Sequence, residues 1–175
     1  MHDPDVATPA VTLNADIDVA HTSAGTPERV LVRIKIANHD SLPIAVVGTG
    51  SQGEDDAPLP AFRMSQGGDL TLERVLIEPQ AGRLAMPPTV YAMQVAAGDT
   101  HSAQISARIL SAYPHQDGTR TQLVTPERVR FCQGIVPFNE ADFARSGNGK
   151  NAWRTPPGSI EAQVTLCSDW VTLTG

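Results

Sequence analysis

One string of residues has the spacing of a dinucleotide-binding turn. Gly48-Thr49-Gly50-Ser51-Gln52-Gly53 reads G-x-G-x-x-G and follows an apolar run. Such a site needs a helix that begins at the glycines and points its N-terminus at the pyrophosphate. Here Glu54-Asp55-Asp56 follow, and then Pro58 and Pro60. Because the acids repel phosphate and the prolines stop a helix, we interpret the segment as a loop, with no cofactor.

Metal binding finds little support in the spacing of the possible ligands. The acidic cluster Glu54 to Asp56 offers carboxylates of the kind that bind Ca²⁺, but not at the spacing of an EF-hand loop. His2 with a free amine chelates copper when it is the first residue, and Met1 precedes it here. No two histidines have the spacing of a local metal site. The sequence predicts no metal site; its histidines are His2, His21, His39, His101 and His115.

Catalytic motifs are equally scarce. The chain has no G-x-S-x-G string, and neither cysteine has a candidate base beside it. One segment places three titratable side chains close together, namely Tyr113, His115 and Asp117. A hydrolase with its site near these three residues is therefore one alternative, although the chain reads more readily as a protein that is not an enzyme.

The two cysteines, Cys132 and Cys167, form an even pair in a chain rich in predicted strands. This pattern suits an oxidising compartment, so we predict that they form a disulfide. The alternative is two unrelated thiols in a cytosolic protein. The disulfide favours an extracytoplasmic protein, periplasmic or secreted, whose signal peptide has been removed before the polar N-terminus.

The segment from Phe138 to Gly158 is the longest stretch without a regular pattern. It carries Trp153, Arg154, Arg145 and Lys150 in a chain of net charge −6. Tryptophan and arginine often anchor protein interfaces, so we predict that these residues form a contact surface for another protein or a surface component. The alternative is that Trp153 plugs one end of the fold.

An exposed tryptophan also stacks on sugars. A carbohydrate-binding module would need two coplanar exposed aromatic side chains, and Trp153 together with Trp170 or Tyr91 are the candidates. This is a further alternative to protein binding.

The stretch from Val30 to Val47 gives the clearest structural signal. Val30, Val32, Ile34 and Ile36 alternate with Leu31, Arg33, Lys35 and Ala37, which predicts a strand with one face in a core. A polar turn and a second apolar run, Ile44-Ala45-Val46-Val47, follow. We interpret the two runs as a hairpin.

Similar alternation recurs along the chain. Val11 to Ala20 alternates without a break, and Ile160 to Cys167 does so near the C-terminus. Thr89 to Val95 and Ala103 to Ile109 flank Ala97-Gly98-Asp99, which predicts a second hairpin.

These patterns predict eight or nine strands and no long amphipathic helix. The fold class is therefore all-β, an antiparallel two-sheet sandwich, and its patterning resembles that of bacterial immunoglobulin-like domains. At 175 residues the chain is long enough for one domain, which we place at residues 11–175 after a flexible N-terminal arm at residues 1–10.

Composition limits the class of partner. A formal charge of −6 and an isoelectric point near 5.2 disfavour nucleic acid. No apolar run approaches the length of a membrane span. The expected function is a non-catalytic extracytoplasmic binding module for another protein or a surface component, acting through its end loops and an edge strand.

Overall fold

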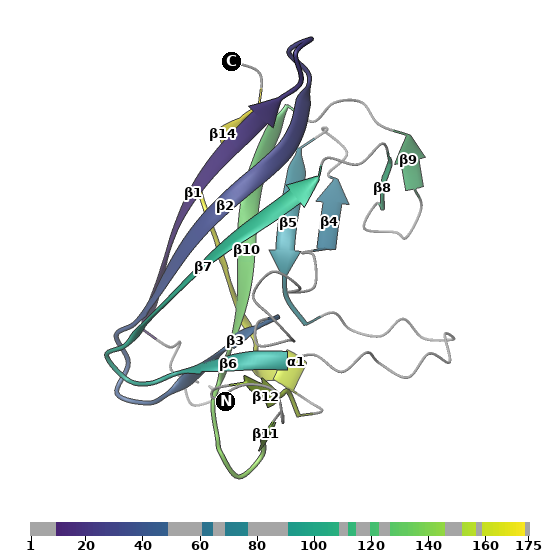
Figure 1. Cartoon of the computed structure of the whole chain (residues 1–175). Helices are drawn as coiled ribbons and strands as arrows, with labels where there is room; N and C mark the ends of the chain where they lie inside the picture. The colour runs from purple at the N-terminus through teal and green to yellow at the C-terminus, as the bar shows by residue number, and fades with distance from the viewer. Residues whose placement is uncertain are drawn as a thin grey trace, which may run out of the picture.

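Two β-sheets face each other across a common apolar core (Figure 1). The structure is a computed structural model. It describes residues 10–48, 61–64, 69–76, 91–108, 112–114, 120–122, 127–145, 152–156 and 159–173.

The smaller sheet, sheet A, has three antiparallel strands in the order β1-β2-β7. They span Val11–His21 (β1), Pro27–Asn38 (β2) and Thr100–Arg108 (β7). The alternation predicted for β2 is confirmed, since Val30, Val32, Ile34 and Ile36 are buried and Arg33 and Lys35 are exposed.

The larger sheet, sheet B, has nine strands within the described ranges. In chain order these are β3 (Ile44–Val47), β4 (Ala61–Met64), β5 (Leu70–Arg74), β6 (Tyr91–Val95), β10 (Arg128–Pro137), β11 (Ala144–Arg145), β12 (Ala152–Arg154), β13 (Val164–Cys167) and β14 (Val171–Thr172). A separate pair consists of β8 (Ala112–Pro114) and β9 (Arg120–Gln122). One helical turn, α1 (Ser159–Ala162), precedes β13.

Strand β10 is the centre of sheet B. Ile135 pairs with Val46 of β3 on one side and with Val164 of β13 on the other. Strands β5 and β3 pair with successive parts of β10, and β5 runs parallel to it. The expectation of a purely antiparallel sandwich is therefore wrong for this one pair.

The main core lies between the two sheets. Its buried side chains come from β2 and β7 on one side and mainly from β3, β5 and β10 on the other. The largest of them are Phe131, Ile36, Ile44, Leu70, Leu72 and Ile135. The all-β two-sheet fold predicted from the alternation is thus present, although the described residues alone form fourteen short and long strands where eight or nine were expected.

Both predicted hairpins are wrong. β2 pairs with β1 and β7, whereas β3 pairs with β6 and β10 in the other sheet. Likewise β6 belongs to sheet B and β7 to sheet A. Each turn therefore carries the chain from one sheet to the other, as happens at the corners of strongly twisted sandwiches. Alternation identifies the buried face of a strand but not the neighbour at each edge.

The two corners lie side by side and are joined at Asn38. The backbone N–H of Asn38 donates to the carbonyl of Asp99 (2.9 Å), and the N–H of Gly98 donates to the carbonyl of Asn38 (2.9 Å). Gly98 has a φ of 79°, a left-handed conformation that favours glycine. β2–β3 and β7–β6 thus form one bent ribbon that contributes to both sheets.

The C-terminal strand is shorter than the alternation indicated. Residues 160 to 162 lie in α1, and the strand begins at Val164. The N–H of Ser159 donates to the carbonyl of Pro156, which closes a turn just before α1. Two prolines and a glycine before Ser159 favour such a turn over a continuous strand.

Candidate functional site

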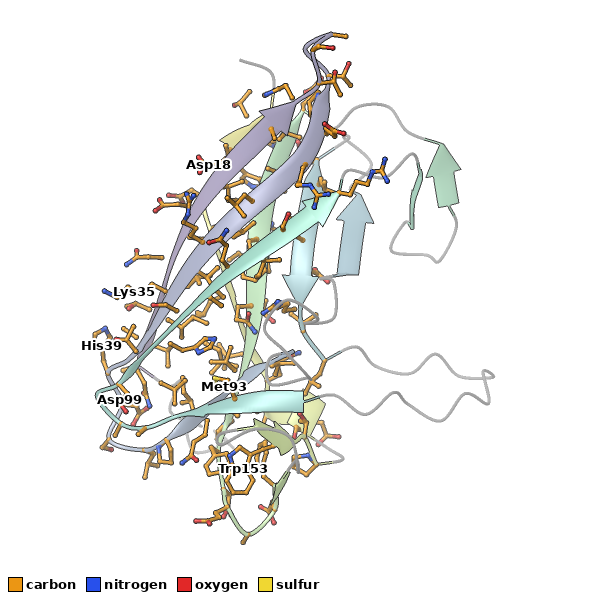
Figure 2. All side chains as sticks on the ribbon, viewed as in Figure 1. Asp18, Lys35, His39, Met93, Asp99 and Trp153 are labelled. Carbon is orange, nitrogen blue, oxygen red and sulfur yellow. A yellow bond between two sulfur atoms is a disulfide. The ribbon has the colours of Figure 1, made fainter. Side chains whose placement is uncertain are left out.

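Trp153, the predicted anchor of the contact surface, is buried. Its side chain is 4 % exposed and belongs to a second, smaller core on the other side of β3 and β6 from the main one (Figure 2). Its ring lies 4.9 Å from that of Phe138 in an edge-on arrangement. Of the two alternatives left open by the sequence, the structure shows a tryptophan that fills one end of the sandwich.

The segment around Trp153 is also more regular than expected. β11 pairs with β12, and β12 pairs with β6, so the segment continues sheet B. Arg145 lies in β11 and Arg154 in β12. Lys150 lies outside the described residues. A binding role for these three cations therefore stays a prediction.

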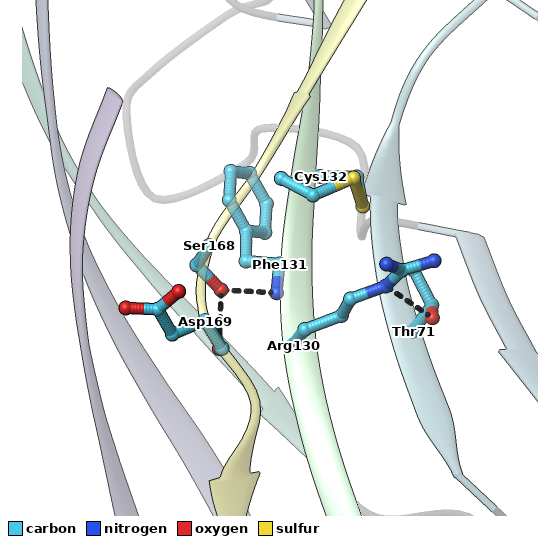
Figure 3. The surroundings of a disulfide bond; sticks show 7 residues. Thr71, Arg130, Phe131, Cys132, Ser168 and Asp169 are labelled. Atoms are coloured by element: carbon cyan, nitrogen blue, oxygen red, sulfur yellow. Dashed lines mark hydrogen bonds between the residues drawn. A yellow bond between two sulfur atoms is a disulfide. The ribbon is translucent and has the colours of Figure 1, made fainter. Parts of the chain in front are cut away.

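The predicted disulfide is confirmed. Cys132 of β10 and Cys167 of β13 lie directly opposite each other and are bonded (Figure 3). Cys132 is buried, while Cys167 lies on the exposed edge. Just beyond the end of β13, the hydroxyl of Ser168 accepts a hydrogen bond from the N–H of Phe131 (2.9 Å). The covalent bond and this hydrogen bond both hold the C-terminal strand to the centre of sheet B.

The outer face of sheet B carries a stack of planar side chains that sequence reasoning missed. The guanidinium groups of Arg128 and Arg130 lie 4.9 and 4.5 Å from the ring of Trp170. Asp69 accepts hydrogen bonds from Arg128, and the Nε of Arg130 donates to Thr71. Alternation in β10 did place both arginines on one face, but nothing in the sequence placed Trp170 beside them.

Asp69 pairs with one of the two cations of this stack, Arg128, while Arg130 is bonded to the neutral hydroxyl of Thr71. Hydrogen bonding to Arg128 lowers the pKa of Asp69 below its usual 3.8, and the same bond raises the pKa of Arg128. Both arginines come from β10 and contact residues of β5 or just before it as well as Trp170 of the C-terminal segment. We therefore interpret the stack as a set of contacts that stabilises sheet B.

Arg74 is another cation that the sequence did not single out. It is buried at the end of β5, and this burial lowers its pKa to about 10. Its side-chain carbons lie close to the backbone of Gly48. The backbone carbonyl of Arg74 accepts from the amide of Gln133, which also donates to Val47 and so spans the gap between β5 and β3.

The remaining candidates fall partly outside the described residues. Of the glycine string only Gly48 is described, and it ends β3 with a φ of 82°. Tyr113 lies in β8, whereas His115 and Asp117 are outside the described part. The hydrolase alternative is therefore untested.

Two of the described histidines, His21 and His39, connect segments that are far apart in the chain. Nε2 of His21 lies 3.2 Å from the carbonyl oxygen of Leu173, which ties the end of β1 to the end of β14. Nε2 of His39 lies 3.1 Å from the hydroxyl of Thr12. Within the described ranges, no three potential metal-ligating side chains gather at one place.

One side of the sandwich is less covered than the rest. β1 is one of the two outer strands of sheet A and, within the described chain, pairs with β2 alone. The inward apolar residues of β2, Val30 to Ile36, are 0–3 % exposed, but those of β1 are only partly buried although they face the same core. These residues of β1 are Val11, Leu13, Ala15, Ile17 and Val19.

Sheet B is open along the same side. β13 and β14 pair only with β10 among the described strands, and β13 approaches β1. Their inward side chains Val164, Leu166 and Val171 are also only partly buried. We use the name open side for this strip; it comprises Val11, Leu13, Ala15, Ile17, Val19, Val164, Leu166 and Val171.

Among the described residues, no helix is long and apolar enough to cross a membrane. The chain matches no protein-family model, no curated protein and no solved structure.

Proposed function

We propose that this chain is a non-catalytic extracytoplasmic sandwich of immunoglobulin-like type that binds another protein through its open side. The class of function is the one expected from the sequence. The contact surface moves from the segment around Trp153 to the open side, because a buried ring cannot anchor a partner.

The observation that carries the proposal is the partial exposure of apolar side chains along the outer edges of the two sheets, where β1 and, facing it, β13 and β14 have no second partner among the described strands. Unpaired edges attract other strands, and proteins usually protect them with lysine, proline or a bulge. β1 has neither lysine nor proline over its length, and its register with β2 is regular from Val11 to Ala20. A long regular edge beside apolar side chains is a surface suited to a partner protein.

The disulfide supports the location. Disulfides persist in oxidising compartments such as the periplasm and the extracellular space, and the bond between Cys132 and Cys167 joins two strands of the core sheet.

Photo-cross-linking tests the proposal. Asn14 on β1 and Ser102 on β7 are both exposed and flank Lys35 in one row across sheet A, at opposite edges. Each is replaced in turn by a photoreactive benzoylphenylalanine, and the folded protein is irradiated with envelope extract from its source organism.

We expect the Asn14 variant to give an adduct of one defined mass that the Ser102 variant does not give. The captured protein, once purified, should bind the unmodified chain in titration. Equal labelling at both edges, no adduct at Asn14, or a purified protein that does not bind would overturn the proposal.

A further inference from the structure

We propose that the partner adds an antiparallel strand to the free edge of β1, and that this strand alternates apolar and basic side chains. The inference rests on the proposed function and specifies how the open side is used.

The direction of the backbone groups in β1 follows from one hydrogen bond. The N–H of His39 donates to the carbonyl of Ala10 over 2.8 Å, and the register places these two residues opposite each other. In an antiparallel pair, hydrogen-bonded and non-bonded pairs alternate. The even-numbered residues from Thr12 to Ala20 therefore bond to β2, and the odd-numbered residues direct their N–H and C=O groups to the free edge.

A second hydrogen bond supports this assignment independently. Asn38 stands opposite Val11, yet its N–H donates to Asp99 on the β7 side. Asn38 therefore does not donate to β1, so the backbone of Val11 is left facing outward from the sheet. The same parity continues along β2 because the register with β1 stays regular from Val11 to Ala20.

The backbone and the side chains of β1 thus both favour an added strand whose inward side chains are apolar. The residues whose N–H and C=O groups face the free edge are also those whose apolar side chains face the core. An added antiparallel strand places its own inward side chains beside them, over β13 and β14. Leu166 and Val171 are only partly buried there, so apolar inward side chains on the partner would complete their burial.

Charge determines the other face of the added strand. On the outer face of β1, Asp16 and Asp18 are exposed, and Arg33, which lies opposite Asp16 on β2, pairs with Asp18 (2.7 Å). Figure 2 shows Asp18 on this side of the molecule. Asp169 is exposed beside β14 on the opposite border of the open side. Lysine or arginine at the outward positions of the partner strand complements these carboxylates.

The same charges disfavour two other occupants of the open side, a second copy of the chain and the chain's own residues 1–9. A second copy paired through β1 would bring Asp16 and Asp18 of both chains together, and like charges on adjacent strands repel. Residues 1–9 of this chain carry Asp3 and Asp5, no lysine or arginine, and two prolines. That composition suits neither the acidic border nor a regular strand.

A synthetic peptide of alternating lysine and valine or isoleucine, nine residues long and blocked at both ends, is the probe. In an antiparallel pair its apolar residues direct their N–H groups to β1 and its lysines direct theirs away. One variant carries N-methyl groups on the apolar residues, and a matched control carries them on the lysines. Binding to the intact disulfide-bonded protein is measured by titration calorimetry.

We expect the plain peptide and the lysine-methylated control to bind alike. The peptide methylated on its apolar residues should bind at least about tenfold more weakly, since its hydrogen bonds to β1 are lost. A version with glutamate in place of lysine should bind more weakly still at low salt. Amide hydrogen exchange should slow at Leu13, Ala15 and Ile17 when the plain peptide is bound.

Variants of the protein give a second line of evidence. Ala15→Pro removes an N–H at the free edge without removing a bond to β2 and should reduce binding, whereas Ala15→Val keeps the N–H and should not. If Ala15→Pro fails to fold, the pair Asp16→Lys and Asp18→Lys replaces it, and should favour the glutamate peptide over the lysine peptide.

Equal binding of the two methylated peptides, or exchange slowed elsewhere, would overturn strand addition. If the cross-link from Asn14 still captures a partner in that case, protein binding stands and only its mode is wrong. If neither peptide nor partner binds, the proposed function itself fails. Concentration-dependent dimers through β1 would show that a second copy is the occupant.

Discussion

The side-chain amide of Asn38 donates a hydrogen bond to the carbonyl oxygen of Val95 over 3.1 Å, and this contact joins the two points at which the chain changes sheets. The same amide also donates to Leu42 and Ala96. Its Oδ1 accepts from the N–H of Asp40. Asn38 is 1 % exposed, so one buried side chain serves the backbone of both corners.

Replacing Asn38 should therefore destabilise the fold. Asn38→Leu leaves buried carbonyl groups without their donor and should lower the free energy of unfolding by roughly 2–4 kcal/mol. Asn38→Asp should be at least as damaging, because it places a carboxylate among carbonyl oxygens. Asn14→Ala on the exposed face of β1 is the control and should change stability little. Urea unfolding measures all three.

The register of β2 predicts opposite effects at adjacent positions. Ile34 is 3 % exposed in the main core, so Ile34→Ala should cost roughly 2–5 kcal/mol through lost burial and a residual cavity. Arg33 is exposed and pairs only with exposed Asp18, so Arg33→Ala should cost less than about 1 kcal/mol. If thermal unfolding showed Arg33→Ala to be more destabilising than Ile34→Ala, the assigned register of β2 would be contradicted.

The disulfide should contribute to stability through the unfolded chain. Cys132 and Cys167 are separated by 35 residues, and closing a loop of that length contributes roughly 3–4 kcal/mol in the chain-entropy model. The double variant Cys132→Ala/Cys167→Ala should unfold at correspondingly lower denaturant concentration. A thiol assay on the denatured, unreduced protein should find no free thiol, and two titratable thiols would refute the bond.

The two tryptophans should respond very differently to truncation. Trp153→Ala removes a ring that is packed against Phe138 and should cost roughly 3–5 kcal/mol. Trp170→Ala removes a half-buried ring on the outer face and should cost clearly less.

Replacing Asn148 to Arg154 with a Gly/Ser linker should lower the melting temperature as Trp153→Ala does. A stable linker variant would show that this end of the fold tolerates the loss of the ring.

Acid should weaken one identified contact. The pKa of Asp69 is lowered from 3.8 by its hydrogen bond to Arg128, so the folded protein favours the charged carboxylate. Its stabilising contribution is present above pH 3.8 and is lost as the pH falls through the lower folded value. The melting temperatures of the protein and of Asp69→Asn should therefore differ at pH 7 and converge below pH 3.8. A difference that stays constant with pH would contradict the assignment.

The sequence by itself determined the class of fold, the inward residues of β1 and β2, and the disulfide. Period-two alternation states which side chains of a strand are buried, and it requires no knowledge of the neighbouring strands. Burial of Ile34 and exposure of Arg33 followed from that rule alone. The pairing of Cys132 with Cys167 followed because the chain has only two cysteines.

Tertiary structure decided which strand lies beside which. The turns after Asn38 and before Thr100 have the residues of hairpin turns, yet both cross between sheets. In the structure the continuous apolar run Ile44 to Val47 is buried on both faces, as is typical of a strand covered on two sides, and it is not the hairpin arm that we expected.

The candidate surface was likewise a tertiary result. The position of Trp153 in a second core and the partial burial of β1 beside β13 depend on contacts between segments more than 50 residues apart in the chain. Local sequence determines which face of each strand is buried and where turns form. Which edge of a strand stays unpaired depends on how all the other strands are arranged. For that reason the open side became visible only in the folded chain.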